Sequence, residues 1–241
     1  LDLDGVLWRG EMPIPGAADA VGRLQAAGTR VVFLTNNAGA TLAEHLAKLA
    51  RMGVEAAPDD LLTSAQAAAT LLSPGATVVP CAGEGVREAL AGAGIRMVEE
   101  GPADAVVVGW HRTFDYDGLA RAADAVRGGA RLIGTNEDAT YPTPEGLLPG
   151  AGALLAAVAT ASGALPEVAG KPHAAMLRLV AERVGPVDTG VGDRPSTDGA
   201  LARALGARFA LVLSGVTAAA EASRVEPLPD VVAPDLAALV P

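Results

Sequence analysis

The chain has 241 residues, a formal net charge of −10 and a sequence pI near 4.7. This acidity argues against a protein that binds nucleic-acid phosphates through a basic patch. The single cysteine rules out an internal disulfide framework and a cysteine-rich zinc site. The longest apolar stretches are shorter than the roughly 18–20 residues that a membrane span needs. We therefore expect neither a nucleic acid nor a membrane as a partner.

The first residue is Leu1 rather than methionine, and it opens a short apolar segment that ends at Asp4-Gly5. Because strands usually run for about 5–6 residues, we expect this strand to begin before Leu1. No signal peptide is visible in the sequence, so the expected location is the cytoplasm.

The first part of the chain alternates short strands with helices. A β-branched run predicts a strand over 29–34, and helical spacing of apolar residues predicts a helix over 17–27. Thr41-x-x-Glu44 and Thr63-x-x-Gln66 are capping-box sequences, which predict the starts of two more helices, the second of which is expected to run to Leu72. Buried strands that alternate with helices indicate a parallel sheet covered on both faces.

Ser73-Pro74-Gly75 interrupts this pattern, and a second alternation of strands and helices follows it. Within it the sequence predicts strands over 76–80, 104–109 and 130–134, and helices over 85–93, 115–126 and from Gly150 to about Gly163. A third block starts at Val168. It is expected to hold a helix with Pro172 at its first position, a strand within 184–191, a helix over 198–205 and a strand over 208–213.

Polar residues follow several of these apolar strands: Asp2 and Asp4, Thr35, and Asp193 with Asp198. In open α/β sheets, ligands bind beyond the carboxyl ends of the strands, so we expect these side chains to converge. Lys171 would join them from a loop at the start of a helix.

This set of residues suits the transfer of a phosphoryl group. Asp2 and Asp4 are two residues apart, so both would point the same way from an extended backbone, and a divalent metal would relieve their repulsion. Asp193 can complete an oxygen-ligand set suited to Mg²⁺. One aspartate can then attack phosphorus, while the second protonates the leaving oxygen and later activates water. Thr35 and the amides after it can hold phosphoryl oxygens, and Lys171 can offset negative charge.

Taken together, these segments resemble the haloacid dehalogenase (HAD) superfamily of phosphatases. The closest likeness is to the subgroup with a C2-type cap, which includes nitrophenylphosphatase-like, phosphoglycolate and glycerol-3-phosphate phosphatases. The resemblance spans nearly the whole chain, and four motifs carry it in order: Asp2-Leu3-Asp4-Gly5-Val6-Leu7, Phe33-Leu34-Thr35-Asn36-Asn37, Gly170-Lys171-Pro172, and Gly192-Asp193-Arg194 with Thr197-Asp198.

The resemblance implies a role for each motif residue. Asp2 would be the nucleophile and Asp4 the acid and base. Mg²⁺ would lie on Asp2, the backbone carbonyl of Asp4 and Asp193, with Asp198 as support. Thr35, Asn36, Asn37 and Lys171 would hold the phosphate. Ala38, Pro195 and Gly199 depart from the family's usual residues, but none of these departures removes a catalytic group.

The resemblance also implies a fold: a doubly wound, Rossmann-like α/β core interrupted by a smaller α/β cap domain. The expected division is core over 1–75, cap over 76–167 and core over 168–241. Within the cap, His111 and Arg112 are candidates for contacts that set substrate specificity. Asn136 and Asp138 lie in a segment that resembles the part of the family's cap near the substrate entrance. Relatives of this kind often dimerise through the cap, so the resemblance leaves a homodimer open, and the sequence shows no interface for it.

The expected function is that of a Mg²⁺-dependent phosphatase, which hydrolyses a small phosphorylated metabolite through an aspartyl-phosphate. Four alternative functions fit the sequence less well. A receiver domain is about half this length and has no residue like Asp4. A dehalogenase of the same fold needs no metal and no second aspartate. A catalytically silent binding scaffold would not need this intact set of residues, and a phosphomutase needs cap residues that we do not identify here.

Overall fold

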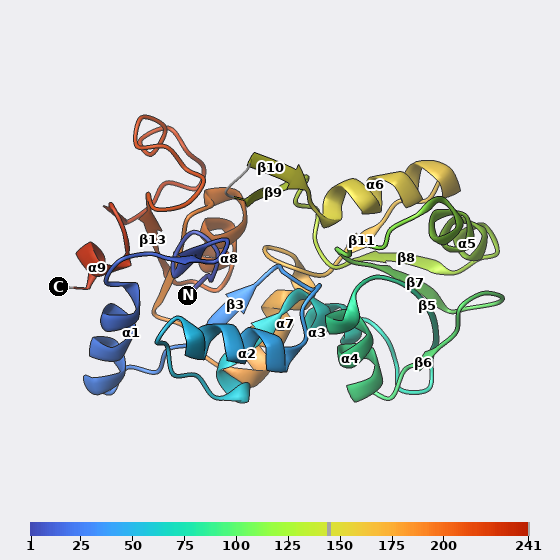
Figure 1. Ribbon diagram of the computed structural model, residues 1–241, viewed down its shortest axis with the longest axis horizontal. Helices are drawn as coiled ribbons and strands as arrows, with labels where there is room; N and C mark the ends of the chain where they lie inside the picture. Colours follow the sequence, from blue (N-terminus) through green and yellow to red (C-terminus); the bar gives the residue numbers. More distant parts are fainter. Residues whose placement is uncertain (144–145, 241) are drawn as a thin grey trace.

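The structure is a computed structural model that describes residues 1–143 and 146–240. It forms two lobes that lie side by side, and both termini lie on the first lobe (Figure 1). Each lobe is a parallel sheet with helices packed against it. The predicted α/β class is therefore confirmed.

The sheet of the second lobe has five parallel strands in the order β11-β8-β7-β5-β6. Its strands are β5 (Thr77–Cys81), β6 (Arg96–Met97), β7 (Ala105–Val108), β8 (Arg131–Gly134) and β11 (Glu167–Val168). Helices α5 (Tyr116–Arg127) and α6 (Ala151–Ser162) cover one face, and α4 (Glu84–Gly92) lies on the opposite side (Figure 1). The central strands β5 and β7 are buried along their whole length, as expected for a parallel sheet covered on both faces.

The first lobe contains two groups of parallel strands. They are β3 (Phe33–Thr35) with β4 (Leu61–Thr63), and β12 (Thr189–Gly192) with β13 (Arg208–Val212) and β14 (Val231–Ala233). The N-terminal segment joins the two groups, because Leu34 N donates to Leu1 O at 2.8 Å and Asp2 N donates to Val191 O at 2.9 Å. The first residues of the chain therefore lie in the middle of this lobe's sheet.

The helices of the first lobe are α1 (Ala17–Ala26), α2 (Leu42–Arg51), α3 (Ser64–Ala69), α7 (Ala174–Arg183), α8 (Ala200–Ala204) and α9 (Leu236–Leu239). Both capping boxes are present: Thr41 Oγ1 accepts from Glu44 N at 3.2 Å, and Thr63 Oγ1 accepts from Gln66 N at 3.2 Å. One prediction is wrong. Pro172 is not the first residue of a helix, because α7 begins at Ala174 with His173 as its N-cap residue.

Two other helix boundaries differ from the sequence prediction. The helix expected from Asp198 begins only at Ala200, after a single π-helical turn over Pro195–Gly199. This wider turn carries Asp198 back toward the end of β12. The helix expected to run from Thr63 into Leu72 is short, because α3 ends at Ala69.

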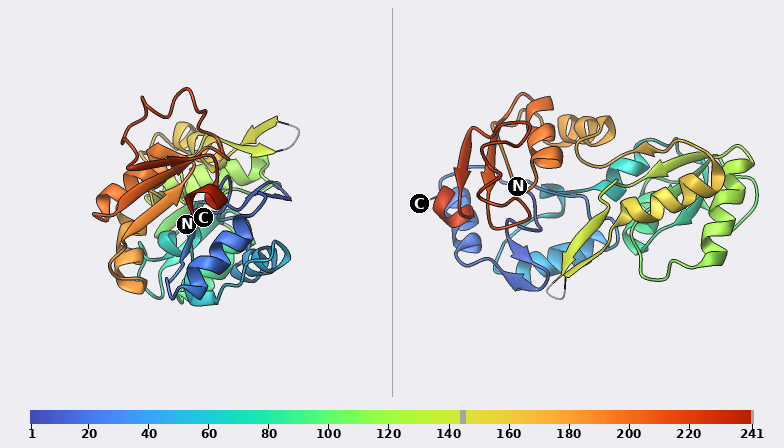
Figure 2. Two further views of the ribbon diagram at one scale, coloured as in Figure 1. Left: turned by 90° about the vertical axis from the view of Figure 1, so that its left-hand side faces the viewer. Right: turned by 90° about the horizontal axis from the view of Figure 1, so that it is seen from above.

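Two hairpins and one 3₁₀ turn complete the described fold. β1 (Trp8–Arg9) pairs with β2 (Met12–Pro13), and β9 (Thr140–Thr143) pairs with β10 (Gly146–Pro149), both antiparallel. The β9–β10 hairpin projects from the second lobe toward the first (Figures 1 and 2). A 3₁₀ turn over Pro58–Asp60 precedes β4.

A single hydrophobic cluster crosses from one lobe to the other. It brings Leu62 and the alanines of α3 together with Leu90 of α4, Met176 of α7 and Ile133 of β8, and all are buried. Within residues 1–143 and 146–240, no helix is long and apolar enough to cross a membrane.

Candidate active site

The carboxyl ends of the two sheets face each other. Asn136, just beyond β8, donates through Nδ2 to the carbonyl of Asn36, just beyond β3, at 2.7 Å. On the same edge, a Cβ added to Gly39 would press against Trp110, which follows β7. The loops after the strands of both lobes therefore meet at one place, where open α/β sheets bind ligands.

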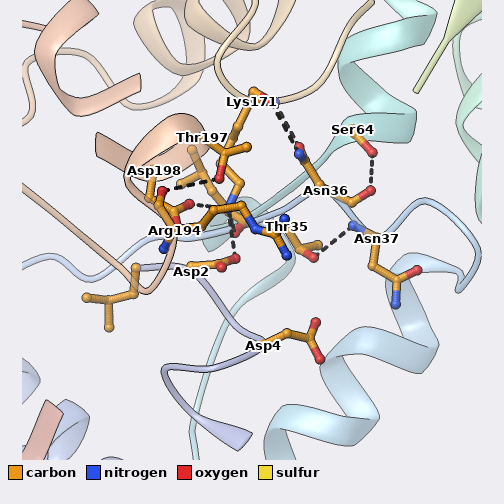
Figure 3. A network of polar contacts seen from close by, with 12 residues as sticks. Asp2, Asp4, Thr35, Asn36, Asn37, Ser64, Lys171, Arg194, Thr197 and Asp198 are labelled. Atoms are coloured by element: carbon orange, nitrogen blue, oxygen red, sulfur yellow. Dashed lines mark hydrogen bonds and ion pairs between the residues drawn. The ribbon is translucent and has the colours of Figure 1, made fainter. Parts of the chain in front are cut away.

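Lys171 lies at the centre of a buried acidic cluster on this edge (Figure 3). Its Nζ donates to Asp2 Oδ1 at 2.8 Å, to Asp198 Oδ1 at 2.7 Å and to the carbonyl of Leu34 at 3.3 Å. Carboxylate oxygens of Asp2, Asp193 and Asp198 all lie within 4.8 Å of one another. The convergence expected from the strand ends is thus present for Asp2, Lys171, Asp193 and Asp198.

Backbone groups hold Asp193 in place. Its Oδ2 accepts from Val216 N at 2.7 Å, and its carbonyl accepts from Thr217 Oγ1 at 2.6 Å. A Cβ at Gly215 or at Gly5 would overlap the Asp193 carboxylate, so these two positions need glycine. Asp198 is fixed from its other side, because Arg194 N donates to its Oδ2 at 3.1 Å.

The ionisation of the cluster reflects its burial. Burial raises the pKa of Asp2 well above its usual value, and the nearby Asp198 and Asp193 add to this although Lys171 opposes it. Burial, together with the charge of Asp198, also raises the pKa of Asp193 to about 6. Burial would lower the pKa of Lys171, but the charges of Asp198 and Asp2 outweigh it and hold that pKa above the usual value.

The donor set fits a hard divalent cation. If all three carboxylates are ionised, the one ammonium of Lys171 leaves two negative charges unbalanced in a buried site. Carboxylate oxygens are the ligands that Mg²⁺ takes in proteins, usually with several waters kept. A cation of charge +2 at this cluster would balance those two negative charges and favour the ionised form of the aspartates, against the effect of burial.

Asp4 does not point where the sequence spacing predicted. Its side chain is outside the acidic cluster, and its Oδ1 accepts from Trp8 Nε1 at 2.9 Å (Figure 3). The prediction that Asp2 and Asp4 share one face assumed extended backbone. The chain instead bends at Leu3, whose carbonyl accepts from Leu7 N at 2.9 Å. It then turns at Gly5, which has a φ of +83° and donates through N to Trp8 O at 2.7 Å.

The three polar residues after β3 have different environments. Thr35 is buried and its Oγ1 accepts from Asn37 N at 3.0 Å; it donates to none of the described residues, so its hydroxyl hydrogen is free to donate to a ligand. The Asn36 side chain turns to Lys171, whose backbone N donates to Asn36 Oδ1 at 2.8 Å. Asn37 Oδ1 accepts from Gly39 N at 3.0 Å. The amide side chains of Asn36 and Asn37 are thus engaged in shaping the loops around the site.

Asp138 reaches from the second lobe to the first. Its Oδ2 accepts from Asn36 Nδ2 at 3.1 Å, and its Oδ1 lies 3.8 Å from Arg194 Nη1. Asn136 supports this arrangement, because its Oδ1 accepts from Asp138 N at 3.1 Å. The sequence singled out Asn136 and Asp138 but not Arg194 or Ser64, whose Oγ donates to the carbonyl of Asn36 at 2.7 Å.

His111 and Arg112 lie elsewhere, on the wall of a cavity of about 360 Å³ in the second lobe. Trp110 and Tyr141 form a corner of it, with ring centroids 5.3 Å apart and ring planes at 84°. The Arg112 guanidinium lies 6.0 Å from the centroid of the Trp110 ring. Most of the remaining wall is apolar and comes from Phe114, β10 and α6.

Comparison with known proteins places the chain in a family. A model of haloacid dehalogenase-like hydrolases matches residues 1–96, and a HAD-hydrolase-like model matches residues 168–239. The crystal structure of a p-nitrophenyl phosphatase from Archaeoglobus fulgidus is 31% identical, with a TM-score of 0.90 over 99% of this chain and 96% of that one. The chain belongs to the haloacid dehalogenase-like hydrolases.

Two further comparisons concern one mycobacterial enzyme. The D-glycerol 3-phosphate phosphatase of Mycobacterium tuberculosis is 40% identical over 235 residues, which are 95% of this chain and 66% of that protein. The chain thus spans about two thirds of the length of this relative. A crystal structure of glycerol phosphate phosphatase from that organism, in complex with magnesium, has a TM-score of 0.91, 39% identity, and covers 99% of this chain and 74% of that one.

These findings confirm the family resemblance drawn from the four motifs. The relatives named are phosphatases, which agrees with the expected class of phosphoric monoester hydrolase. The family models match two separate segments, residues 1–96 and 168–239, and the division into core and cap stays a prediction.

Proposed function

We propose that the protein is a Mg²⁺-dependent phosphatase that hydrolyses a small phosphorylated metabolite. The observation that carries this proposal is the buried cluster in which Lys171 Nζ lies 2.8 Å from Asp2 and 2.7 Å from Asp198, beside Asp193. The cluster combines a nucleophile, a fixed cation and a set of oxygen ligands. The kinship with phosphatases, one of them described with magnesium, supports the same conclusion.

Mg²⁺ would be held by carboxylate oxygens of Asp2 and Asp193 and by the backbone carbonyl of Asp4, with Asp198 in support. When bound, it would neutralise the carboxylates and the phosphate that approaches them. Asp198 also belongs to the group of close oxygens, although the family resemblance assigns it only a supporting role.

In the first step, an oxygen of Asp2 attacks phosphorus and the bond from phosphorus to the leaving oxygen breaks. Asp4 gives its proton to that oxygen, which departs as an alcohol. In the second step, the Asp4 carboxylate takes a proton from water. The water oxygen attacks the phosphorus of the aspartyl-phosphate, which releases inorganic phosphate and restores the Asp2 carboxylate.

Two residues stabilise the transferred group. The Thr35 hydroxyl has its hydrogen free, so it can donate to a phosphoryl oxygen. Lys171 is fixed by two carboxylates and one carbonyl, so its charge is already in place when the phosphate develops negative charge. Backbone amides beyond Thr35 would complete the set of donors.

The second lobe would act as a cap that selects the leaving group. We propose the division of the chain into core over 1–75, cap over 76–167 and core over 168–241. In support, the five-stranded sheet starts at Thr77, and only its last strand, β11, runs across the second boundary. The cavity walled by Trp110 and Tyr141 would take the leaving group, with Arg112 and His111 as polar contacts.

Phosphate release from p-nitrophenyl phosphate tests the proposed function. The protein should lose its phosphatase activity after chelation with EDTA and regain turnover when Mg²⁺ is added. Asp2→Asn should lose at least about 10³-fold in turnover, because the nucleophile is removed. Asp19→Asn, which changes an exposed residue of α1, should keep the turnover of the wild-type protein. Hydrolysis that persists without metal, or full turnover by Asp2→Asn, would contradict the proposal.

The role of the cavity is tested separately with a panel of phosphorylated metabolites. Arg112→Ala and Trp110→Ala should change the ranking of substrates by KM and leave the dependence on Mg²⁺ intact. An unchanged ranking in both variants would show that the cavity does not select the substrate. It would say nothing against the proposed chemistry at Asp2.

A further inference from the structure

Trp8 is folded back onto Asp4 by the turn at Gly5. Its indole is buried, with 1% of the residue exposed, and Nε1 donates to Asp4 Oδ1 at 2.9 Å. The turn itself is fixed by the bond from Gly5 N to Trp8 O and by the close approach of Gly5 to the Asp193 carboxylate. The indole therefore has little freedom to leave Asp4.

Lys48 of α2 holds the Trp8 ring from one face. Its Nζ lies 4.7 Å from the ring centroid, donates to the carbonyl of Gly10 at 2.8 Å and lies 3.1 Å from a carboxylate oxygen of Glu11. These contacts tie the β1–β2 hairpin to α2 and keep the indole N–H aimed at Asp4. The result is a chain of contacts from α2 through Trp8 to the carboxylate of Asp4.

The chemistry of this bond distinguishes the two oxygens of Asp4. An indole N–H is a donor and cannot accept a hydrogen bond. When Asp4 is protonated, its hydroxyl oxygen is a weaker acceptor than its carbonyl oxygen. The bond from the indole to Oδ1 therefore favours the proton on Oδ2. Among the described residues, no other hydrogen bond to the Asp4 side chain is present.

We propose that Trp8 is the positioning residue of the acid and base: its N–H reserves Oδ1 of Asp4, so that Oδ2 alone carries the transferable proton. This inference rests on the proposed function, in which Asp4 protonates the leaving oxygen. In the first step the hydrogen on Oδ2 passes to the leaving oxygen as its bond to phosphorus breaks. In the second step Oδ2 takes a proton from the attacking water. Without the indole N–H, the proton is shared between both oxygens and the carboxyl group rotates.

The test uses Trp8→Phe, which keeps an aromatic ring in the buried position and removes only the donor and part of the ring. A series of substituted phenyl phosphates, from p-nitrophenyl to phenyl, varies the basicity of the leaving oxygen with little change of shape. A poor leaving group needs its proton more than a good one. We expect kcat/KM of Trp8→Phe to fall about 10-fold for phenyl phosphate and less than about 2-fold for p-nitrophenyl phosphate.

Two controls separate positioning from a general loss of packing. Ile14→Val removes one methyl group from the same hydrophobic cluster, so it should leave the ratio between the two esters unchanged. In an Asp4→Asn background, Trp8→Phe should no longer alter that ratio, because the two residues act through one proton. Equal losses on both esters in the single variant would overturn the proposal.

The bond can also be observed in the folded chain without changing Trp8. The sequence holds two tryptophans, so Trp110→Phe identifies the indole N–H signal of Trp8 in a nitrogen-15 NMR spectrum. Asp4→Asn should shift the Trp8 signal and leave the Trp110 signal in place. A Trp8 signal that does not shift would show that the hydrogen bond between Trp8 and Asp4 is absent, and would overturn the proposal. Wild-type protein that hydrolyses no ester of the series would instead overturn the proposed function, and the role of Asp4 with it.

Discussion

Asn36 Nδ2 lies 3.1 Å from Asp138 Oδ2, and this bond joins the loop after β3 in one lobe to the loop after β8 in the other. The same carboxylate lies 3.8 Å from Arg194, which is next to Asp193. Asp138 thus connects the second lobe to two of the segments that build the acidic cluster. A contact at this point holds the loop after β8 against the loops beside the acidic cluster.

Removing the Asp138 carboxylate should loosen that arrangement. A hydrogen bond to a charged group contributes about 1.5–3 kcal/mol, so we expect Asp138→Ala to lower kcat/KM about 10-fold, mainly by raising KM. Steady-state kinetics with p-nitrophenyl phosphate measures this. Glu137→Gln is the matched control, because Glu137 is exposed and its oxygen pairs with His173 at 3.0 Å instead. A KM for Asp138→Ala equal to that of Glu137→Gln would refute the connection.

Lys171→Met should affect stability and turnover together. The substitution leaves the buried carboxylates of Asp2 and Asp198 without their common cation. Breaking a buried ion pair costs about 3–5 kcal/mol, and loss of a fixed positive charge at the reacting group costs at least about 100-fold in kcat. Chemical denaturation and phosphate release measure the two effects. Arg127→Met, which breaks an exposed pair with Asp124, should change the free energy of unfolding by at most about 1 kcal/mol.

Metal binding should stabilise the fold more at neutral than at acidic pH. The raised pKa values of Asp2 and Asp193 mean that the folded, metal-free protein holds protons that the unfolded chain releases. Since the native state binds more protons, the stability of the metal-free protein falls as the pH rises from about 4 through about 6.

Mg²⁺ replaces those protons, so the rise in Tm on adding Mg²⁺ should be several degrees larger at about pH 7.5 than at about pH 5. Thermal melts with and without the metal at each pH provide the measurement. Asp193→Asn cannot ionise, so this variant should show a smaller rise with a weaker dependence on pH. A rise of the same size at both pH values would speak against the cluster as the metal site.

Gly215→Ala should disturb the site without touching a catalytic group. The added Cβ would overlap the Asp193 carboxylate and push it out of the cluster. We expect the concentration of Mg²⁺ needed for half-maximal activity to rise at least about 10-fold, since a misplaced ligand costs more than about 1.4 kcal/mol. Gly22→Ala is the control: its Cβ would meet no atom within 4 Å on α1, so it should stabilise the helix by up to about 1 kcal/mol.

Cys81 should be inert in the folded protein. It lies in β5, and burial raises the pKa of its thiol to about 11. The thiolate is the reactive form, so a disulfide reagent at about pH 8 should label the native chain very slowly and the denatured chain completely. Rapid labelling of native protein would show that β5 opens more readily than its burial indicates.

The sequence by itself determined the class of the fold and the family. Apolar strands alternating with capped helices predict a covered parallel sheet, and the capping boxes at Thr41 and Thr63 form as predicted. The residues after the strands already contain the carboxylates, the threonine and the lysine of the four motifs at family spacing. These features depend on local backbone preferences and on the order of residues along the chain, which can be read directly.

Only the tertiary structure decided where those side chains point and what they contact. The turn at Gly5 directs Asp4 to Trp8 and away from Asp2, and the π-helical turn over Pro195–Gly199 carries Asp198 into the acidic cluster. The side chain of Asn36 bridges to Asp138, more than a hundred residues away along the chain. Such contacts join segments that are distant in sequence, and their geometry depends on the packing of both lobes, which no local pattern of residues specifies.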